Sequence, residues 1–207
     1  MLLLAVIAGV AVGGVAIQQA LARLGADLER RFRAAPPLRA ATFAEEVYGR
    51  VEGVLHATEP PILAPGSEAP CVYYELIVRH DGVPRDRLRR RREMPAWVDH
   101  ERFVGGVDVV VQVDGVEVAI DLPEAVLVAG VTTDHRGDPR VPGQYAATIV
   151  STVRALPPDA RVRVVGTLTR DVDTRPEAAA AAGYRETPIR WRLTARPDRP
   201  LLIGLAP

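Results

Sequence analysis

The stretch that decides the fold of this chain is V107-D-V-V-V-Q-V-D-G-V-E-V-A-I-D-L122. Valine occupies every second position from Val107 to Val113, and apolar residues alternate again from Val116 to Leu122. A period of two places one apolar face on each of two strands. The intervening Asp114-Gly115 is typical of a type I′ turn, which needs positive φ at both positions. The stretch therefore predicts a tight antiparallel hairpin.

Further strands are expected on both sides of this hairpin. Runs rich in β-branched or aromatic residues predict strands at 47–57, 71–80, 124–131, 161–171, 188–195 and 200–206. In the run C71-V-Y-Y-E-L-I-V-R-H80, the more apolar face consists of Val72, Tyr74, Leu76 and Val78. We therefore expect Cys71, Tyr73 and Glu75 to lie on the more polar face.

Two segments favour helices inside this β-rich region. Residues 144–156 fit either period, and Pro157-Pro158 directly after them favours a helix that ends there. Residues 176–183 are alanine-rich, with a proline in the first turn and a glycine at the end. The predicted fold class is α+β, mostly β. A single N-terminal transmembrane helix would precede one β-rich domain, residues 44–207, that has one or two helices.

The N-terminal segment is expected to anchor the chain in a membrane. Residues 2–22 contain no charged residue, and their helical length of about 31 Å would match a bilayer core of about 30 Å. Ala20-Leu21-Ala22 resembles a signal-peptidase site, but the positively charged start of a signal peptide is missing. We therefore expect residues 1–36 to form a membrane anchor and a helical stalk that ends at Pro36-Pro37.

The composition restricts the possible chemistry. Apolar residues make up 48% of the chain, enough for a folded core, and the formal net charge is zero. Because the net charge is zero, we do not expect a nucleic-acid partner. All 26 basic residues are arginine, so chemistry that depends on lysine is excluded. With one cysteine and four histidines, we expect neither a structural zinc site of the cysteine-rich kind nor another cofactor.

No recognised catalytic motif occurs, so any enzyme would have to be of an unfamiliar type. One such hypothesis is a hydrolase in which Cys71 acts with His80 or His100. The other notable feature is the run R85-D-R-L-R-R-R-R92, which is typical of a solvated loop. On the cytoplasmic side of a membrane, Arg89, Arg90, Arg91 and Arg92 could instead contact anionic lipid.

Several motifs together resemble the GIDE or BAM ("beside a membrane") domain family, which includes the mitochondrial membrane-bound E3 ubiquitin ligase MULAN and prokaryotic relatives. The likeness covers residues 47–205. It rests on Gly49-x-Val51-x-Gly53, the proline-rich segment 60–65, P70-C-V-Y-Y-E-L-I-V-R-H80, Trp97, the hairpin 107–122 and A160-R-V-R-V-V-G-T-L-T-R-D171. An anchor helix directly before the domain also matches. In this family the Pro-Cys pair at the start of a strand reads as structural.

The resemblance implies a sensing or substrate-recognising domain rather than a ligase. A RING domain needs about eight cysteine and histidine ligands, which this sequence cannot supply. We therefore expect neither a RING nor a second membrane helix, and ubiquitin-ligase activity is not carried over.

The expected function is a membrane-anchored, non-catalytic binding module that recruits a protein or ligand. The expected contact residues are Cys71, Tyr73, Glu75 and Trp97. Alternatives are the Cys71 hydrolase, a module acting on the membrane surface through its arginines, and an accessory related to ubiquitin ligases by family alone.

The expected location is the bacterial inner membrane, which a single segment would cross. Arginines follow the apolar segment and none precedes it, which places the domain in the cytoplasm by the positive-inside rule. In the mitochondrial relatives the domain faces the intermembrane space, which implies the periplasm instead.

Overall fold

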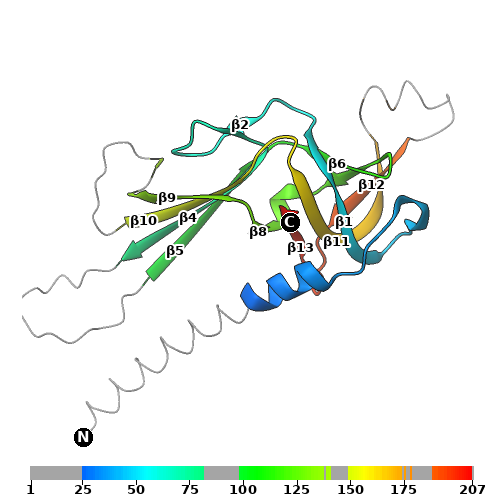
Figure 1. Ribbon diagram of the computed structural model, residues 1–207, viewed down its shortest axis with the longest axis horizontal. Helices are drawn as coiled ribbons and strands as arrows, with labels where there is room; N and C mark the ends of the chain where they lie inside the picture. Colours follow the sequence, from blue (N-terminus) through cyan, green and yellow to red (C-terminus); the bar gives the residue numbers. More distant parts are fainter. Residues whose placement is uncertain are drawn as a thin grey trace, which may run out of the picture.

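The computed structural model describes residues 25–81, 98–137, 139–140, 149–173, 175, 178 and 188–206. In this part of the chain nearly all regular structure is β (Figure 1). The strands are β1 (Val47–Ala57), β2 (Ile62–Leu63), β3 (Pro70–Cys71), β4 (Tyr73–Asp81), β5 (Val98–Gly106), β6 (Val109–Val113), β7 (Val116–Ile120), β8 (Ala125–Ala129), β9 (Val131–Arg136), β10 (Ile149–Leu156), β11 (Arg161–Val172), β12 (Ile189–Thr194) and β13 (Leu201–Leu205). Of two short 3-10 helices, η1 (Ala40–Thr42) precedes β1 and η2 (Leu122–Glu124) lies between β7 and β8.

Five strands close into a small barrel, in the order β1, β6, β7, β12, β11 and back to β1. All neighbours are antiparallel except β7 and β12, which run parallel. The closing pair is β1 with β11, whose register runs from Val47 opposite Leu168 to Val54 opposite Arg161. Five is also the number of strands in the OB-fold, a partly open Greek-key barrel.

The predicted hairpin of residues 107–122 is confirmed as β6 and β7. Asp114 has φ 49° and Gly115 has φ 84°, as a type I′ turn requires. The inward residues Val109, Val111 and Val118 are buried in the barrel. Gly53 allows β1 to approach this hairpin, because a Cβ atom there would lie 2.0 Å from the carbonyl oxygen of Gln112.

A second sheet is built from two insertions into the barrel. β4 and β5 come from the connection between β1 and β6, while β9 and β10 come from the connection between β7 and β11. Together they form an antiparallel sheet in the order β5, β4, β10, β9, which extends away from the barrel in Figure 1. β13 and β8 add to the other side of β11, and β2 pairs with β3.

Among the described residues, the hydrophobic core has three parts. The largest fills the barrel and includes Val51, Leu55, Val164 and Leu193. A smaller cluster lies against the second sheet and includes Ala64, Cys71, Leu76, Val78 and Val153. The third joins the helical residues 25–34 to the outside of β11 and β13, and includes Phe32, Ala35, Val165 and Leu202.

The described part of the N-terminal helix does not stand apart as a stalk. Phe32 is 5% exposed, and the guanidinium of Arg163 lies 5.6 Å from the centre of its ring. The helix ends at Ala34, just before the predicted stop at Pro36-Pro37. The backbone then pairs with β1, where the Arg50 amide donates to the Pro36 carbonyl at 2.8 Å. Residues 25–34 are thus fastened to the barrel.

The expected α+β class is wrong, because the structure is mostly β with a closed barrel and one described helix. The helix predicted over 144–156 is also wrong for residues 149–156, which form β10 between β4 and β9. Among the described residues, no helix is both long and apolar enough to cross a bilayer. The anchor predicted at 2–22 and most of the predicted helix 176–183 lie outside the described residues.

Candidate functional site

A groove of about 770 Å³ runs over the outer face of the barrel. This volume is in the usual range of ligand sites. Its floor is formed by β6 and β7. Its walls come from Thr58 and Glu59, which follow β1, from β12, and from Arg175 and Ala178 between β11 and β12. The lining residues are Thr58, Glu59, Asp108, Val109, Val110, Glu117, Ala119, Ile120, Arg175, Ala178, Arg190 and Arg192.

The sheet register explains the order of side chains across the groove. Val110 on β6 is opposite Ala119 on β7, and Ala119 is in turn opposite Arg192 on β12. Each of these positions alternates with an inward residue, so the three share the outer face. Val110 and Ala119 are each 5% exposed. A small apolar floor therefore lies directly beside an arginine.

Arg175 is fully engaged in holding one wall. Its guanidinium donates to both carboxylate oxygens of Asp173, at 2.9 and 2.7 Å, and to Glu117 on β7 at 2.7 Å. The hydrogen bond from Arg175 lowers the pKa of Asp173, although burial acts in the opposite direction. These carboxylates in turn raise the pKa of Arg175. Arg175 therefore ties the start of the β11–β12 connection to the barrel.

Arg190 and Arg192 are less completely paired. Both approach the same carboxylate oxygen of Asp171, at 4.0 and 3.2 Å respectively. The Nε atom of each arginine is buried and has no hydrogen-bond partner among the described residues. Two guanidinium groups thus share one counter-ion, and each retains an unsatisfied donor.

The opposite wall is acidic. Asp108 and Glu59 are exposed, and neither carboxylate forms an ion pair with another described residue. Their position is fixed by the backbone, because both the amide and the hydroxyl of Thr58 donate to the Asp108 carbonyl, at 2.9 and 3.0 Å. The groove therefore has arginines on one side and carboxylates on the other.

Two of the residues predicted to bind a partner lie instead at the junction of the two sheets. Tyr73 is 1% exposed and donates to the Ala125 carbonyl on β8 at 3.1 Å. Glu75 is 4% exposed, accepts from Arg102, and lies 3.9 Å from Arg154. Arg102 also donates to the Ala125 carbonyl at 3.1 Å. Binding through Tyr73 and Glu75 stays a prediction, and in this structure both side chains are occupied by internal contacts.

Cys71 is also buried, at 2% exposure, in the cluster below the second sheet. Burial raises the pKa of its thiol, opposed by a backbone hydrogen bond from Ala64. The expectation that Cys71 lies on the polar face of its strand is therefore wrong. His80 lies seven positions after Tyr73 on β4, roughly 23 Å along an extended strand. His100 pairs with the neighbouring Arg79. Neither backbone position is near enough for a Cys71–histidine dyad.

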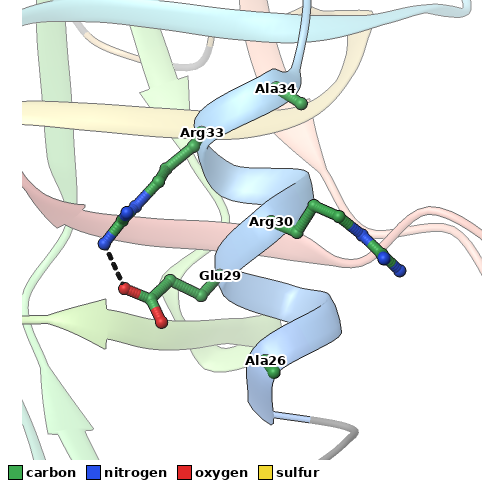
Figure 2. Close-up of a pocket in the computed structure, with 5 residues that line it drawn as sticks. All are labelled: Ala26, Glu29, Arg30, Arg33 and Ala34. Atoms are coloured by element: carbon green, nitrogen blue, oxygen red, sulfur yellow. Dashed lines mark hydrogen bonds and ion pairs between the residues drawn. The ribbon is translucent and has the colours of Figure 1, made fainter.

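The other predicted contacts, Trp97 and Arg89 to Arg92, lie outside the described residues. Within the described ranges, no three metal-ligating side chains form a cluster. Figure 2 shows another hollow, on the exposed side of helical residues 25–34, where Glu29 and Arg33 form an ion pair. Since its lining, Ala26, Glu29, Arg30, Arg33 and Ala34, comes from a single helix, it is a surface depression between neighbouring side chains.

The groove residues were not singled out from the sequence. They come from three distant parts of the chain, around residues 58–59, 108–120 and 175–192, which only the barrel register brings together. One signal was present in I189-R-W-R-L-T194, where two arginines occupy one face of a strand whose other face is apolar. In comparisons with known proteins, no protein family, no curated protein and no solved structure matches this chain.

Proposed function

We propose that this protein is a membrane-anchored binding module that holds a partner in the groove of its barrel and has no catalytic activity of its own. The observation that carries the proposal is the groove, which combines a small apolar floor with charged groups whose hydrogen-bonding capacity is unused. Such a combination is typical of binding sites. The anchor is proposed from the uncharged residues 2–22. The same segment supports the proposed location, the bacterial inner membrane.

The position of the groove supports this proposal by fold analogy. OB-type barrels bind ligands on the face of their second and third strands and at two neighbouring loops. The second and third barrel strands here are β6 and β7, which supply the groove floor. Residues of the connection after β1, and Arg175 and Ala178 between β11 and β12, line the walls. The analogy concerns the place of binding and says nothing of the ligand's identity.

Photo-crosslinking in native membranes tests the proposal. The full chain would carry p-benzoylphenylalanine at Glu59, which is exposed at the groove rim. A matched protein would carry it at Val131, which is 53% exposed on β9. We expect one defined adduct from position 59 that disappears when Ala119→Trp fills the groove floor. An equal adduct from position 131, or an adduct that survives Ala119→Trp, would contradict binding in the groove.

The anchor is tested separately by extraction of membranes with alkaline carbonate. We expect the full chain to stay in the membrane fraction, because removing about 20 apolar residues from lipid is strongly unfavourable. A chain that lacks residues 2–22 should be released. Retention of the shortened chain would contradict an anchor at that segment.

A further inference from the structure

We infer that the groove binds an extended polypeptide with an acidic residue, an apolar residue and a basic residue at alternate positions. This inference rests on the proposed function and names the class of partner. It is carried by the unequal charge of the two walls and by the geometry of the sheet between them.

The acidic residue of the partner would contact the two arginines of β12, Arg190 and Arg192. Arg190 and Arg192 share one oxygen of Asp171, so their pair of positive charges has a single counter-ion. A carboxylate is bound most strongly when it accepts from Nε and Nη of one guanidinium together. The Nε donors of both arginines are unpaired among the described residues, and they are buried.

The basic residue of the partner would contact the carboxylates of the opposite wall, Glu59 and Asp108. Asp108 directly precedes β6, and β7 lies between β6 and β12. Two strand spacings of about 4.8 Å therefore separate Asp108 from β12. Arg192 is level with Val110, two residues beyond Asp108, which adds about 7 Å along the strands. The two walls are therefore about 12 Å apart along the diagonal.

This separation fixes the spacing of charges in the partner. An extended peptide rises about 3.3 Å per residue, and its side chains face the same side only at even spacings. A separation of about 12 Å thus corresponds to residues i and i+4. Residue i+2 would then face the floor at Val110 and Ala119, which favours an apolar side chain. The expected pattern is Asp/Glu-x-apolar-x-Lys/Arg.

A polyanion is disfavoured as the occupant. The groove lining contains three arginines and three carboxylates, and Asp171 and Asp173 lie directly behind the arginines. Nucleic-acid sites need an excess of positive charge and usually stack bases on aromatic rings. The described lining residues include no aromatic side chain.

The test uses the full chain in lipid nanodiscs and a displayed library of random nine-residue peptides. We expect the selected peptides to share the charge pattern given above. Their affinity, measured by fluorescence anisotropy, should fall about tenfold or more with Arg192→Gln and also with Asp108→Asn. Arg136→Gln and Glu68→Gln, which change exposed residues outside the groove, serve as matched controls and should leave the affinity unchanged. Thermal unfolding of each variant checks that its fold is retained.

A charge exchange gives the decisive result. Asp108→Arg should weaken binding of a selected peptide, and replacing the basic residue of that peptide by glutamate should restore it. Selected peptides without the pattern, or affinities that Arg192→Gln and Asp108→Asn leave unchanged, would overturn this inference. So would a selection that enriches no peptide, or groove-dependent binding of a dT12 oligonucleotide. The proposed function is judged separately, by whether the adduct at position 59 depends on an open groove.

Discussion

Glu75 on β4 accepts a hydrogen bond from Arg102 on the neighbouring strand β5, at the junction where the second sheet meets β8. Glu75 is 4% exposed, and Arg154 approaches its other oxygen from β10. Arg102 and Arg154 both also donate to carbonyl groups of β8, at 3.1 and 3.5 Å. One buried carboxylate therefore orients two arginines that fasten the second sheet to the rest of the molecule.

Removal of the Glu75 charge should weaken this junction. We expect Glu75→Gln to lower the free energy of unfolding by about 1–3 kcal/mol, because two arginines lose the acceptor that orients them. Urea denaturation of the full chain in detergent would measure the effect. The control is Glu101→Gln, since Glu101 is exposed in the same sheet and its contact with Arg140 spans 3.6 Å. A loss no larger than in the control would contradict a role for Glu75 at the junction.

Barrel closure should depend on the absence of a side chain at Gly53. A Cβ atom there would lie 2.0 Å from the Gln112 carbonyl oxygen and 2.8 Å from Val111 Cγ1. We expect Gly53→Ala to destabilise the protein by about 1–3 kcal/mol or more, through forced separation of β1 and β6. Gly25→Ala is the matched control, because a Cβ at that helical position meets no atom within 4 Å. Equal unfolding midpoints for the two variants would show that β1 and β6 can adjust without cost.

Acid should loosen the wall of the groove that Asp173 supports. The pKa of this carboxyl is lowered below 3.8 chiefly by the hydrogen bond from Arg175, so its ionised form is stabilised by folding. The stabilisation is fully present above pH 3.8, the unfolded value, and is lost as the pH falls through the lower folded value. Stability measured against pH should therefore fall less steeply in Asp173→Asn across this acidic range. Parallel curves for the two proteins would contradict the linkage.

Cys71 should be unreactive in the native protein. Its thiol is buried and its pKa is raised, so both access and the fraction of thiolate are low. We expect iodoacetamide to modify Cys71 at pH 8 only after the protein is unfolded in guanidinium chloride, as intact-mass spectrometry would show. Rapid modification under native conditions would instead support the hypothesis of a reactive cysteine.

The sequence predicted the local parts of the fold well. The hairpin 107–122 was correct because both its alternation and its turn depend on adjacent residues. Residues 149–156 were assigned wrongly because Pro157-Pro158 ends a strand as readily as a helix. What makes them a strand is tertiary: β10 lies between β4 and β9, and the buried Ser151 hydroxyl donates to the Gly137 carbonyl at 2.6 Å.

The candidate site could not be predicted in the same way. Cys71, Tyr73 and Glu75 were assigned to a polar face because one strand was considered alone. The structure buries both faces of β4, one against the cluster that holds Ala64 and the other at the junction with β8. Likewise, Val110, Ala119 and Arg192 become neighbours only through pairing of β6, β7 and β12.

The pairing of β1 with β11 has a consequence for the order in which the protein folds. Val47 on β1 pairs with Leu168 on β11. The barrel therefore cannot close until most of the chain has been synthesised. During that interval β1 has only the β6–β7 hairpin as a partner from the barrel, while β4 and β5 can already pair with each other. Until residues 161–172 have left the ribosome, one edge of β1 therefore lacks its barrel partner and is open to wrong pairing.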